Sequence, residues 1–217
     1  MSTQNTIFTI IAVAIIVIVV WVGGTKKVAS ITPTTIGENT ITTETKPEIK
    51  SAVNSKKPMT TVTMTTNKGA ITLELFADTK PKTVENFTKL ASEGFYNGTR
   101  FHRVIKGFMI QGGDPLSKDT SKMSAWGTGG PGYSFADELS TENKNVIGTI
   151  SMANSGPDTN GSQFFINTAN NNFLDTKHTA FGKVVAGMEV VAAIENTKTV
   201  QNDRPLEDMI IEKIEVK

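Results

Sequence analysis

Alternating apolar and polar positions dominate the chain beyond residue 59 and predict many short strands. Residues 60–66 and 70–76 alternate on either side of a turn at residues 67–69, which is typical of a β-hairpin. Four further runs rich in β-branched or aromatic residues favour strands: residues 147–153, 163–168, 180–185 and 209–216. The pattern therefore indicates a domain made mainly of β-strands.

Helical spacing of apolar positions appears in two separate segments. In residues 81–91 the apolar side chains recur at helical intervals, Asp78 and Thr79 precede Pro81 as candidate caps, and Gly94 ends the segment. Residues 188–194 predict a second helix. Many short strands with two separated helices predict an antiparallel sheet closed into a barrel, with helices covering its ends.

Residues 101–114 read FHRVIKGFMIQGGD and predict two short strands separated at Lys106 and Gly107. Side chains alternate between the two faces of a strand. The residues expected to share a face are Phe101, Arg103 and Ile105 in the first run, and Met109 and Gln111 in the second.

Arg103 is unusual because it lies in phase with apolar neighbours, and arginine is rarely buried without a partner. One interpretation is a structural ion pair, for which Asp114 is a candidate. The other is a guanidinium that donates into an apolar pocket lined by Phe108 and Met109. The stretch alone does not decide between the two.

The N-terminal segment differs sharply from the rest of the chain. Residues 7–22 are apolar apart from Thr9, and residues 7–24 would span about 27 Å as a helix, close to the ~30 Å of a bilayer core. Lysine and arginine are absent from residues 1–6, whereas signal peptides usually begin with them. We therefore predict a single-pass membrane anchor within residues 1–24, with a cleaved signal peptide as the alternative.

Residues 25–58 predict a flexible tether, because they are rich in threonine, lysine and proline and contain no aromatic residue. Lys26 and Lys27 favour a cytoplasmic position for this side of the anchor. A long polar spacer instead suits a domain held away from the outer surface of a membrane, so we expect residues 59–217 to be an extracytoplasmic domain.

Charge and composition exclude several classes of function. Lys+Arg 22 against Asp+Glu 21 gives a net charge of +1, so no basic field attracts nucleic acid. With no cysteine and two histidines, the chain has no thiolate nucleophile and too few soft ligands for a zinc site, and we expect no metal or cofactor. Residues 127–132 fit G-x-G-x-x-G but neither leave a strand nor open a helix, which argues against a dinucleotide site.

Several long motifs together resemble the cyclophilin family of peptidyl-prolyl cis-trans isomerases. They are FHR…GFMIQGGD within residues 101–114, SMAN at 151–154, GP-x-TNGSQFFI at 156–166 and LD-x-KH…FGKV at 174–184. The resemblance runs from about residue 61 to residue 216 with the same order and spacing. It leaves only the predicted anchor and tether uncovered.

This resemblance implies a closed eight-stranded antiparallel β-barrel with two capping α-helices and a substrate groove on its outer face. It implies that Arg103 and Gln111 are catalytic. It also implies that the proline ring and the flanking peptide are held by the remaining candidate site residues: Phe108, Met109, Ala153, Asn154, Gln163, Phe165, Phe173, Leu174 and His178.

Three positions depart from the family pattern. Phe173 replaces a tryptophan found in many eukaryotic members, whose indole N–H helps to bind cyclosporin, so we expect weak cyclosporin binding but intact catalysis. Lys106 replaces a frequent proline, and the loop from Asp114 to Tyr133 differs from well-known members. We expect a loop of this length to be functional or mobile.

The sequence thus predicts a monomeric, membrane-tethered enzyme that accelerates the rotation of X-Pro bonds in unfolded or newly exported polypeptides. The alternative is a chaperone or scaffold that captures proline-containing peptides in the same groove without useful turnover.

Overall fold

The computed structural model describes residues 60–217. The anchor and the tether predicted for residues 1–58 lie outside the described residues. Within residues 60–217, no helix combines the length and apolar character that crossing a bilayer requires.

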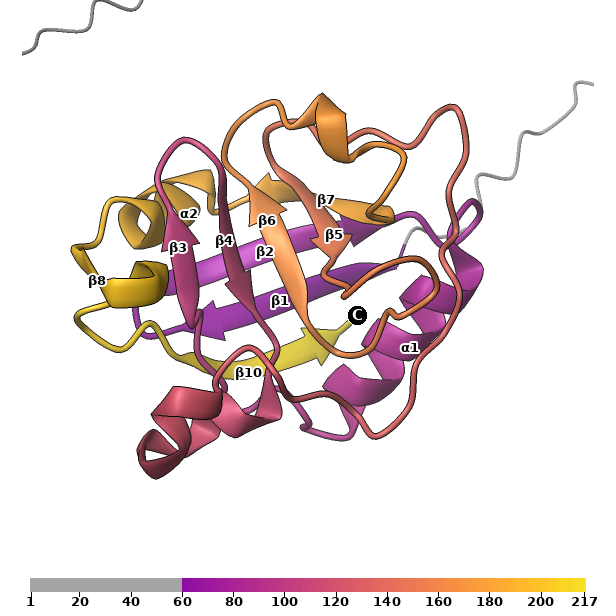
Figure 1. Ribbon diagram of the computed structural model, residues 1–217. Helices are drawn as coiled ribbons and strands as arrows, with labels where there is room; N and C mark the ends of the chain where they lie inside the picture. The colour runs from indigo at the N-terminus through magenta and orange to yellow at the C-terminus, as the bar shows by residue number, and fades with distance from the viewer. Residues whose placement is uncertain (1–59) are drawn as a thin grey trace, which may run out of the picture. The chain divides into compact units, whose positions relative to one another are not determined.

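An eight-stranded antiparallel sheet forms the framework of the domain (Figure 1). Its strands are β1 Thr61–Thr66, β2 Gly69–Leu75, β3 Arg103–Ile105, β4 Met109–Gly112, β5 Thr149–Met152, β6 Phe164–Asn167, β7 Ala180–Ala186 and β10 Ile211–Val216. They lie in the order β10-β1-β2-β7-β5-β6-β4-β3. The predicted hairpin is β1 and β2, and the prediction of a mainly β domain is confirmed.

The prediction of a closed barrel needs correction, because the edge strands β3 and β10 do not pair along their length. Within residues 60–217, the two edges meet around an isolated bridge between Arg100 and Ile210, which lie just before these two strands. There the Phe101 N–H donates to the Met209 carbonyl oxygen over 2.9 Å. The sheet is therefore a half-barrel that curls until its edges meet at one end.

Both predicted helices are present as α1 Pro81–Ser92 and α2 Met188–Glu195. The apolar stripe of α1 is buried against the sheet at Val84, Phe87 and Leu90, as its spacing predicted. The position of the cap differs from the prediction, because Lys80 is the N-cap without a side-chain cap hydrogen bond and Glu138 holds the N-terminus of α1. That carboxylate accepts from the Thr83 backbone N–H over 2.8 Å. A partner so distant in sequence leaves no local signal.

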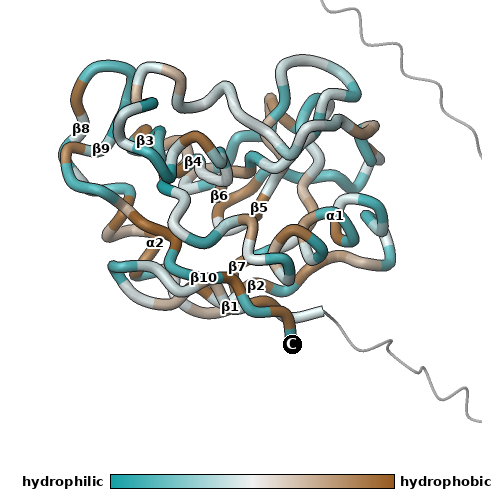
Figure 2. The backbone as a smooth tube through the Cα atoms, turned by 90° about the horizontal axis from the view of Figure 1, so that it is seen from below, coloured by the Kyte–Doolittle hydropathy of each residue, from teal (hydrophilic) through white to brown (hydrophobic). Residues whose placement is uncertain are grey.

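The core lies between the sheet and the helices and is centred on buried aromatic rings. Phe87 packs against Tyr96 at 5.2 Å, Phe181 at 5.2 Å and Phe164 at 5.5 Å between ring centroids. Edge-to-face and tilted contacts of this kind stabilise a core beyond area burial alone. Figure 2 shows apolar residues on the strands and helices and hydrophilic residues along the outer loops.

Phe101 also belongs to this core, which corrects the predicted face of the first short strand. Its ring is 1% exposed and meets Phe164 edge-to-face at 6.3 Å. Since β3 begins only at Arg103, strand alternation does not reach back to Phe101. Val104 faces the same core, whereas Arg103 and Ile105 are partly exposed on the other side of β3.

The segment after β4 is more ordered than a mobile loop, because it contains the 3₁₀ helices η1 Pro115–Lys118 and η2 Thr120–Ala125. The buried Asp114 organises it. Its carboxylate accepts from the backbone N–H of Leu116 at 2.7 Å, of Gly129 at 3.3 Å and of Gly127. The glycine-rich run therefore folds around a carboxylate of its own chain.

Candidate active site

A cavity of about 190 Å³ lies on the outer face of β3, β4 and β6. Nine of the eleven predicted site residues line it: Arg103, Phe108, Met109, Gln111, Ala153, Asn154, Phe165, Leu174 and His178. Gln163 lines an adjoining cavity of about 380 Å³, and Phe173 stacks on Phe108 at the rim. We call the smaller cavity the proline-side cavity.

Strand register brings three of these side chains into one row. Arg103 of β3 pairs with Gln111 of β4, and Gln111 pairs with Phe165 of β6. Directly opposed residues in antiparallel strands place their side chains on the same face, with Cβ atoms about 5 Å apart. The sheet therefore positions a guanidinium, an amide and an aromatic ring side by side.

The floor of the proline-side cavity is an apolar cluster separate from the core. Met109 is 2% exposed, Phe165 4% and Leu174 8%, and Leu174 comes from the 3₁₀ helix η3 Asn172–Leu174. At the rim, Phe108 stacks on Phe173 with ring centroids 5.9 Å apart and planes 18° from parallel. Phe173 is 65% exposed, so its stacking partner covers one face of the ring only.

His178 and Asn154 are held by their own chain. His178 Nδ1 lies 3.0 Å from the Met152 carbonyl oxygen, which can only accept, so Nδ1 carries the proton. The imidazole ring meets Phe165 edge-to-face at 5.4 Å. The Asn154 amide donates to the Lys177 carbonyl oxygen over 2.8 Å. These contacts fix the far wall of the cavity.

Arg103 does form an ion pair, but its partner is Asp203 and not Asp114. Arg103 Nε lies 3.4 Å from Asp203 Oδ2, and the two side chains are 43% and 47% exposed. Asp203 ends the 3₁₀ helix η4 Gln201–Asp203, where Asn202 and Asp203 have φ of 63° and 58°. Left-handed backbone costs most residues about 1 kcal/mol or more, although asparagine and aspartate tolerate it best.

Asp203 could not be predicted from the sequence as the partner of Arg103, because the two residues lie 100 positions apart in the chain. The residue types of the segment Gln201-Asn202-Asp203 predict a turn, but they do not predict a contact with β3. Consecutive left-handed residues that bring a carboxylate to a site arginine are a form of strain that often marks function.

A hydrogen-bonded relay connects the sheet to the glycine-rich loop. The Gln111 amide donates to Gln163 Oε1 over 3.0 Å. The Gln163 amide in turn donates to the carbonyl oxygens of Gly127 at 3.0 Å and Gly129 at 2.8 Å. Gln163 thus stands between Gln111 and the loop that Asp114 organises.

No three histidine, aspartate or glutamate side chains within residues 60–217 gather in a way that could hold a metal ion. The second histidine, His102, is buried beside Arg103, and burial lowers its pKa from the ordinary range. The chemistry that the site offers is therefore an apolar pocket beside a fixed guanidinium and two linked amides.

Residues 61–216 match the family model described as "Cyclophilin type peptidyl-prolyl cis-trans isomerase/CLD". This chain belongs to the cyclophilin family. Among curated relatives, this chain is 49% identical over 156 residues to peptidyl-prolyl cis-trans isomerase CYP71 of Arabidopsis thaliana. The match covers 71% of this chain but only 24% of that longer protein. This chain is 47% identical over 156 residues to CYP18-1 of the same plant, covering 71% of this chain and 94% of that protein.

Solved structures agree with this assignment. A crystal structure of a cyclophilin type peptidyl-prolyl cis-trans isomerase from Cryptosporidium parvum superimposes on the structure of this chain with a TM-score of 0.67 and 37% sequence identity. The match covers 73% of this chain and 98% of that one. A second structure of the parasite protein was determined in the presence of the dipeptide Ala-Pro, and it matches with a TM-score of 0.66.

Proposed function

We propose that this cyclophilin catalyses the cis-trans isomerisation of X-Pro peptide bonds in the proline-side cavity. The observation that supports this best is the row of Arg103, Gln111 and Phe165 on one face of the sheet. It puts a cation and an amide against the apolar floor formed with Met109 and Leu174. A structure of the similar parasite protein determined in the presence of the dipeptide Ala-Pro also supports the proposal.

The reaction breaks no covalent bond. Rotation about a peptide C–N bond faces a barrier of about 18–20 kcal/mol, because it interrupts amide resonance. Both isomers of an X-Pro bond are populated, and uncatalysed exchange takes tens of seconds or more. A catalyst therefore needs neither a nucleophile nor an acid–base pair, and it has only to stabilise the twisted amide.

The cavity offers two means of doing so. The planar amide is more dipolar than the twisted one, so an apolar floor of Met109, Phe165 and Leu174 disfavours the planar ground state. In the twisted state the proline nitrogen regains its lone pair, to which the Arg103 guanidinium can donate. Because that donation is possible only near the transition state, it lowers the barrier without holding the ground state.

Asp203 supports this role of Arg103. The contact with Asp203 uses Nε, and the four N–H groups of the two terminal nitrogens are left for a substrate. Arginine suits the position because it stays charged when half-buried. We expect Gln111, held by Gln163, and the backbone around Ala153 and Asn154 to hold the flanking peptide, so that one side of the bond turns.

Arg103→Ala is the decisive variant. Removing one positioned donor to a transition state typically costs 10²–10³ in rate, and we expect exchange on an Ala-Pro peptide to slow by about 10²-fold. Arg103→Lys serves as the matched control, because it keeps the charge but loses the planar fork. Unchanged exchange in Arg103→Ala would refute the catalytic role of Arg103. Peptide binding without accelerated exchange in the wild type would favour the non-catalytic chaperone or scaffold instead.

We further propose that residues 7–24 anchor the protein in a membrane and that residues 25–58 hold the catalytic domain on the extracytoplasmic side. The hydropathy and length of residues 7–24 support the anchor. Clients would then be proline-containing segments of newly exported polypeptides. Protease digestion of intact cells, with the mass of the mature N-terminus, tests both points. A domain cleaved only after cell lysis contradicts the orientation, and a mature N-terminus beyond residue 24 contradicts the anchor.

A further inference from the structure

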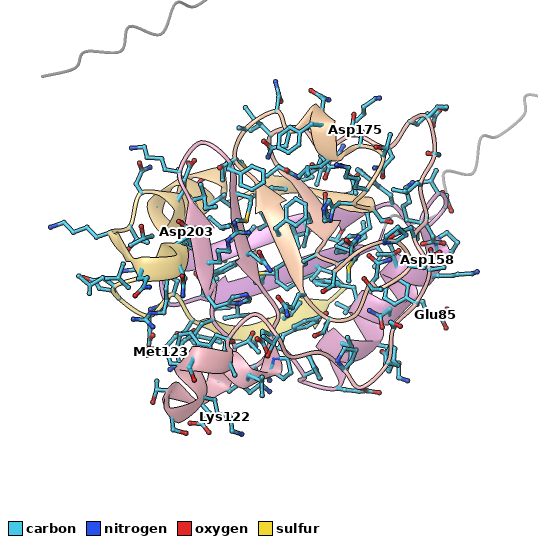
Figure 3. The ribbon with its side chains drawn as sticks, viewed as in Figure 1. Glu85, Lys122, Met123, Asp158, Asp175 and Asp203 are labelled. Carbon is cyan, nitrogen blue, oxygen red and sulfur yellow. The ribbon has the colours of Figure 1, made fainter. Side chains whose placement is uncertain are left out.

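A second and larger cavity lies on the other side of Arg103 from the proline-side cavity. Its volume is about 570 Å³, and Arg103 and Gln111 belong to both. Its remaining walls come from the end of η2 and from η4 with the residue that follows it, including Met123, Trp126 and Arg204. We call it the arginine-side cavity. Figure 3 shows Met123 and Asp203 at the same end of the molecule.

The aromatic wall of the arginine-side cavity is held in place by polar contacts. The Trp126 indole N–H donates to the Asp119 carbonyl oxygen over 3.1 Å. The Arg100 guanidinium lies over the Trp126 ring at 5.4 Å from its centroid. Since Arg100 is itself paired with Asp208 at 3.0 Å, its charge is already neutralised. The wall therefore exists before any substrate binds.

Arg204 supplies the opposite wall from the two-residue strand β9 Arg204–Pro205, which pairs with β8 Thr199–Val200. It is partly buried, and no acidic side chain within residues 60–217 pairs with it. A guanidinium group binds a carboxylate or phosphate well, often through two parallel hydrogen bonds. Arg204 therefore faces the cavity with its charge unsatisfied.

The other charged groups of the cavity do not cancel this charge. Arg103 and Asp203 neutralise one another across 3.4 Å. His102 is 6% exposed, and burial lowers its pKa, so it adds no charge to the cavity at neutral pH. The cavity therefore carries one net positive charge, located at Arg204.

We infer that the arginine-side cavity binds an acidic side chain of the substrate at a position flanking the proline, and that Arg204 is the specificity-determining residue. This inference rests on the proposed isomerase activity. Arg103 and Gln111 line both cavities, so a polypeptide that holds its proline over Phe165 and continues past these two side chains places a neighbouring residue at the arginine-side cavity. A glutamate there gains the Arg204 guanidinium as a partner, whereas a lysine is repelled by it.

The test compares Ala-Pro peptides that carry Glu, Gln or Lys at each of the two positions before and after the Ala-Pro pair. The readout is the ratio of kcat/KM for the Glu and Lys peptides, which is internal to each protein. A partly exposed ion pair changes affinity by up to about fivefold, and with repulsion of lysine we expect a Glu/Lys ratio of about tenfold at one position. Arg204→Glu should invert this ratio, and Arg204→Gln should bring it near one.

Lys213→Glu is the matched control, because it changes the net charge equally at an exposed site on β10 and should leave the ratio unchanged. A wild-type ratio near one at every position, with exchange intact, overturns the inference and leaves the proposed function standing. A ratio that persists in both Arg204 variants overturns the assignment to Arg204. Absence of exchange on every peptide overturns the proposed function itself.

Discussion

The two sides of Arg103 are built by different means. On the proline side, strand register positions Arg103, Gln111 and Phe165, and the floor is buried apolar surface. On the arginine side, the walls come from 3₁₀ helices and turns held by single carboxylates, Asp114 and Asp203. Many hydrogen bonds of the sheet together fix the strand register, whereas each loop depends on the contacts of a single carboxylate.

Substitutions on the two sides of Arg103 should therefore have different consequences. We call the proline side the strand-built side and the other the loop-built side. On the strand-built side, a single substitution is not expected to move a residue, because that would require a strand to shift its register and turn its side chains to the other face. The loop-built side can be reshaped by altering one polar anchor. We therefore expect the chemistry to depend on the strands and the choice of substrate to depend on the loops.

Asp114→Asn should produce the largest effect and separate the two sides. The new amide group would face the backbone N–H groups of Gly127 and Gly129, which now donate to the carboxylate. Hydrogen bonds to charged groups contribute about 1.5–3 kcal/mol each when buried. Because these glycines are partly solvent-exposed, we expect the free energy of unfolding to fall by about 2 kcal/mol in urea titrations.

Asp119→Asn is the control for this variant. Asp119 also accepts from a backbone N–H, that of Ser121 at 2.9 Å, but it is exposed, so water can replace the lost contact. Its loss of stability should be much smaller. If the two variants unfold at the same urea concentration, Asp114 does not organise the loop.

Gln163→Ala should have the next largest effect, because Gln163 links both sides. Removing it leaves the Gln111 amide without its 3.0 Å partner and the Gly127 and Gly129 carbonyl oxygens without a donor. We expect kcat/KM on an Ala-Pro peptide to fall about tenfold, which corresponds to about 1.4 kcal/mol.

Gln163→Glu separates the contribution of the contact with Gln111 from that of the contacts with the loop. A glutamate can still accept from Gln111 but cannot donate to the two carbonyl oxygens of the loop. Exchange on a short Ala-Pro peptide should then fall by no more than about threefold, while the preference for an acidic flanking residue weakens. Equal losses in both Gln163 variants would show that orientation of Gln111 contributes little.

The strand-built side could largely be predicted from the sequence. Alternation in residues 101–114 predicted the two short strands β3 and β4. The motifs that resemble cyclophilins predicted eleven site residues, and nine of them line one cavity in the structure. Period-2 alternation works here because the sheet has one buried face. It failed at Phe101 because the strand begins two residues later.

The loop-built side could not be predicted, because its contacts join residues far apart in the chain. The Arg103–Asp203 pair spans 100 residues, and Glu138 reaches the start of α1 across 55. Turn residues such as Asn202 predict a change of chain direction, but they do not predict which distant residue the turn will contact. The half-barrel has the same origin, since its closure depends on where Met209 meets Phe101.

Asp203→Asn tests whether the loop-built side also contributes to the chemistry. Asparagine tolerates left-handed backbone well, so the turn should persist while the charge is lost. Since both side chains are nearly half-exposed, the pair contributes at most about 1 kcal/mol. We expect kcat to fall about threefold with KM unchanged. In an Arg103→Ala background the same substitution should have no further effect. A rise in KM instead would mean that Asp203 binds substrate directly.

Phe173→Trp should have the smallest effect on exchange, because Phe173 is 65% exposed at the rim of the strand-built side. Tryptophan can keep the stack on Phe108, which now has ring centroids 5.9 Å apart, and it adds an indole N–H. We expect kcat/KM on Ala-Pro to change less than twofold. Cyclosporin should bind about fivefold more tightly, since one net hydrogen bond contributes about 1 kcal/mol. Phe173→Leu, which removes the aromatic stack and adds no donor, should not improve cyclosporin binding. If Phe173→Leu tightened binding as much as Phe173→Trp does, the shape of the rim and not the missing donor would limit the ligand.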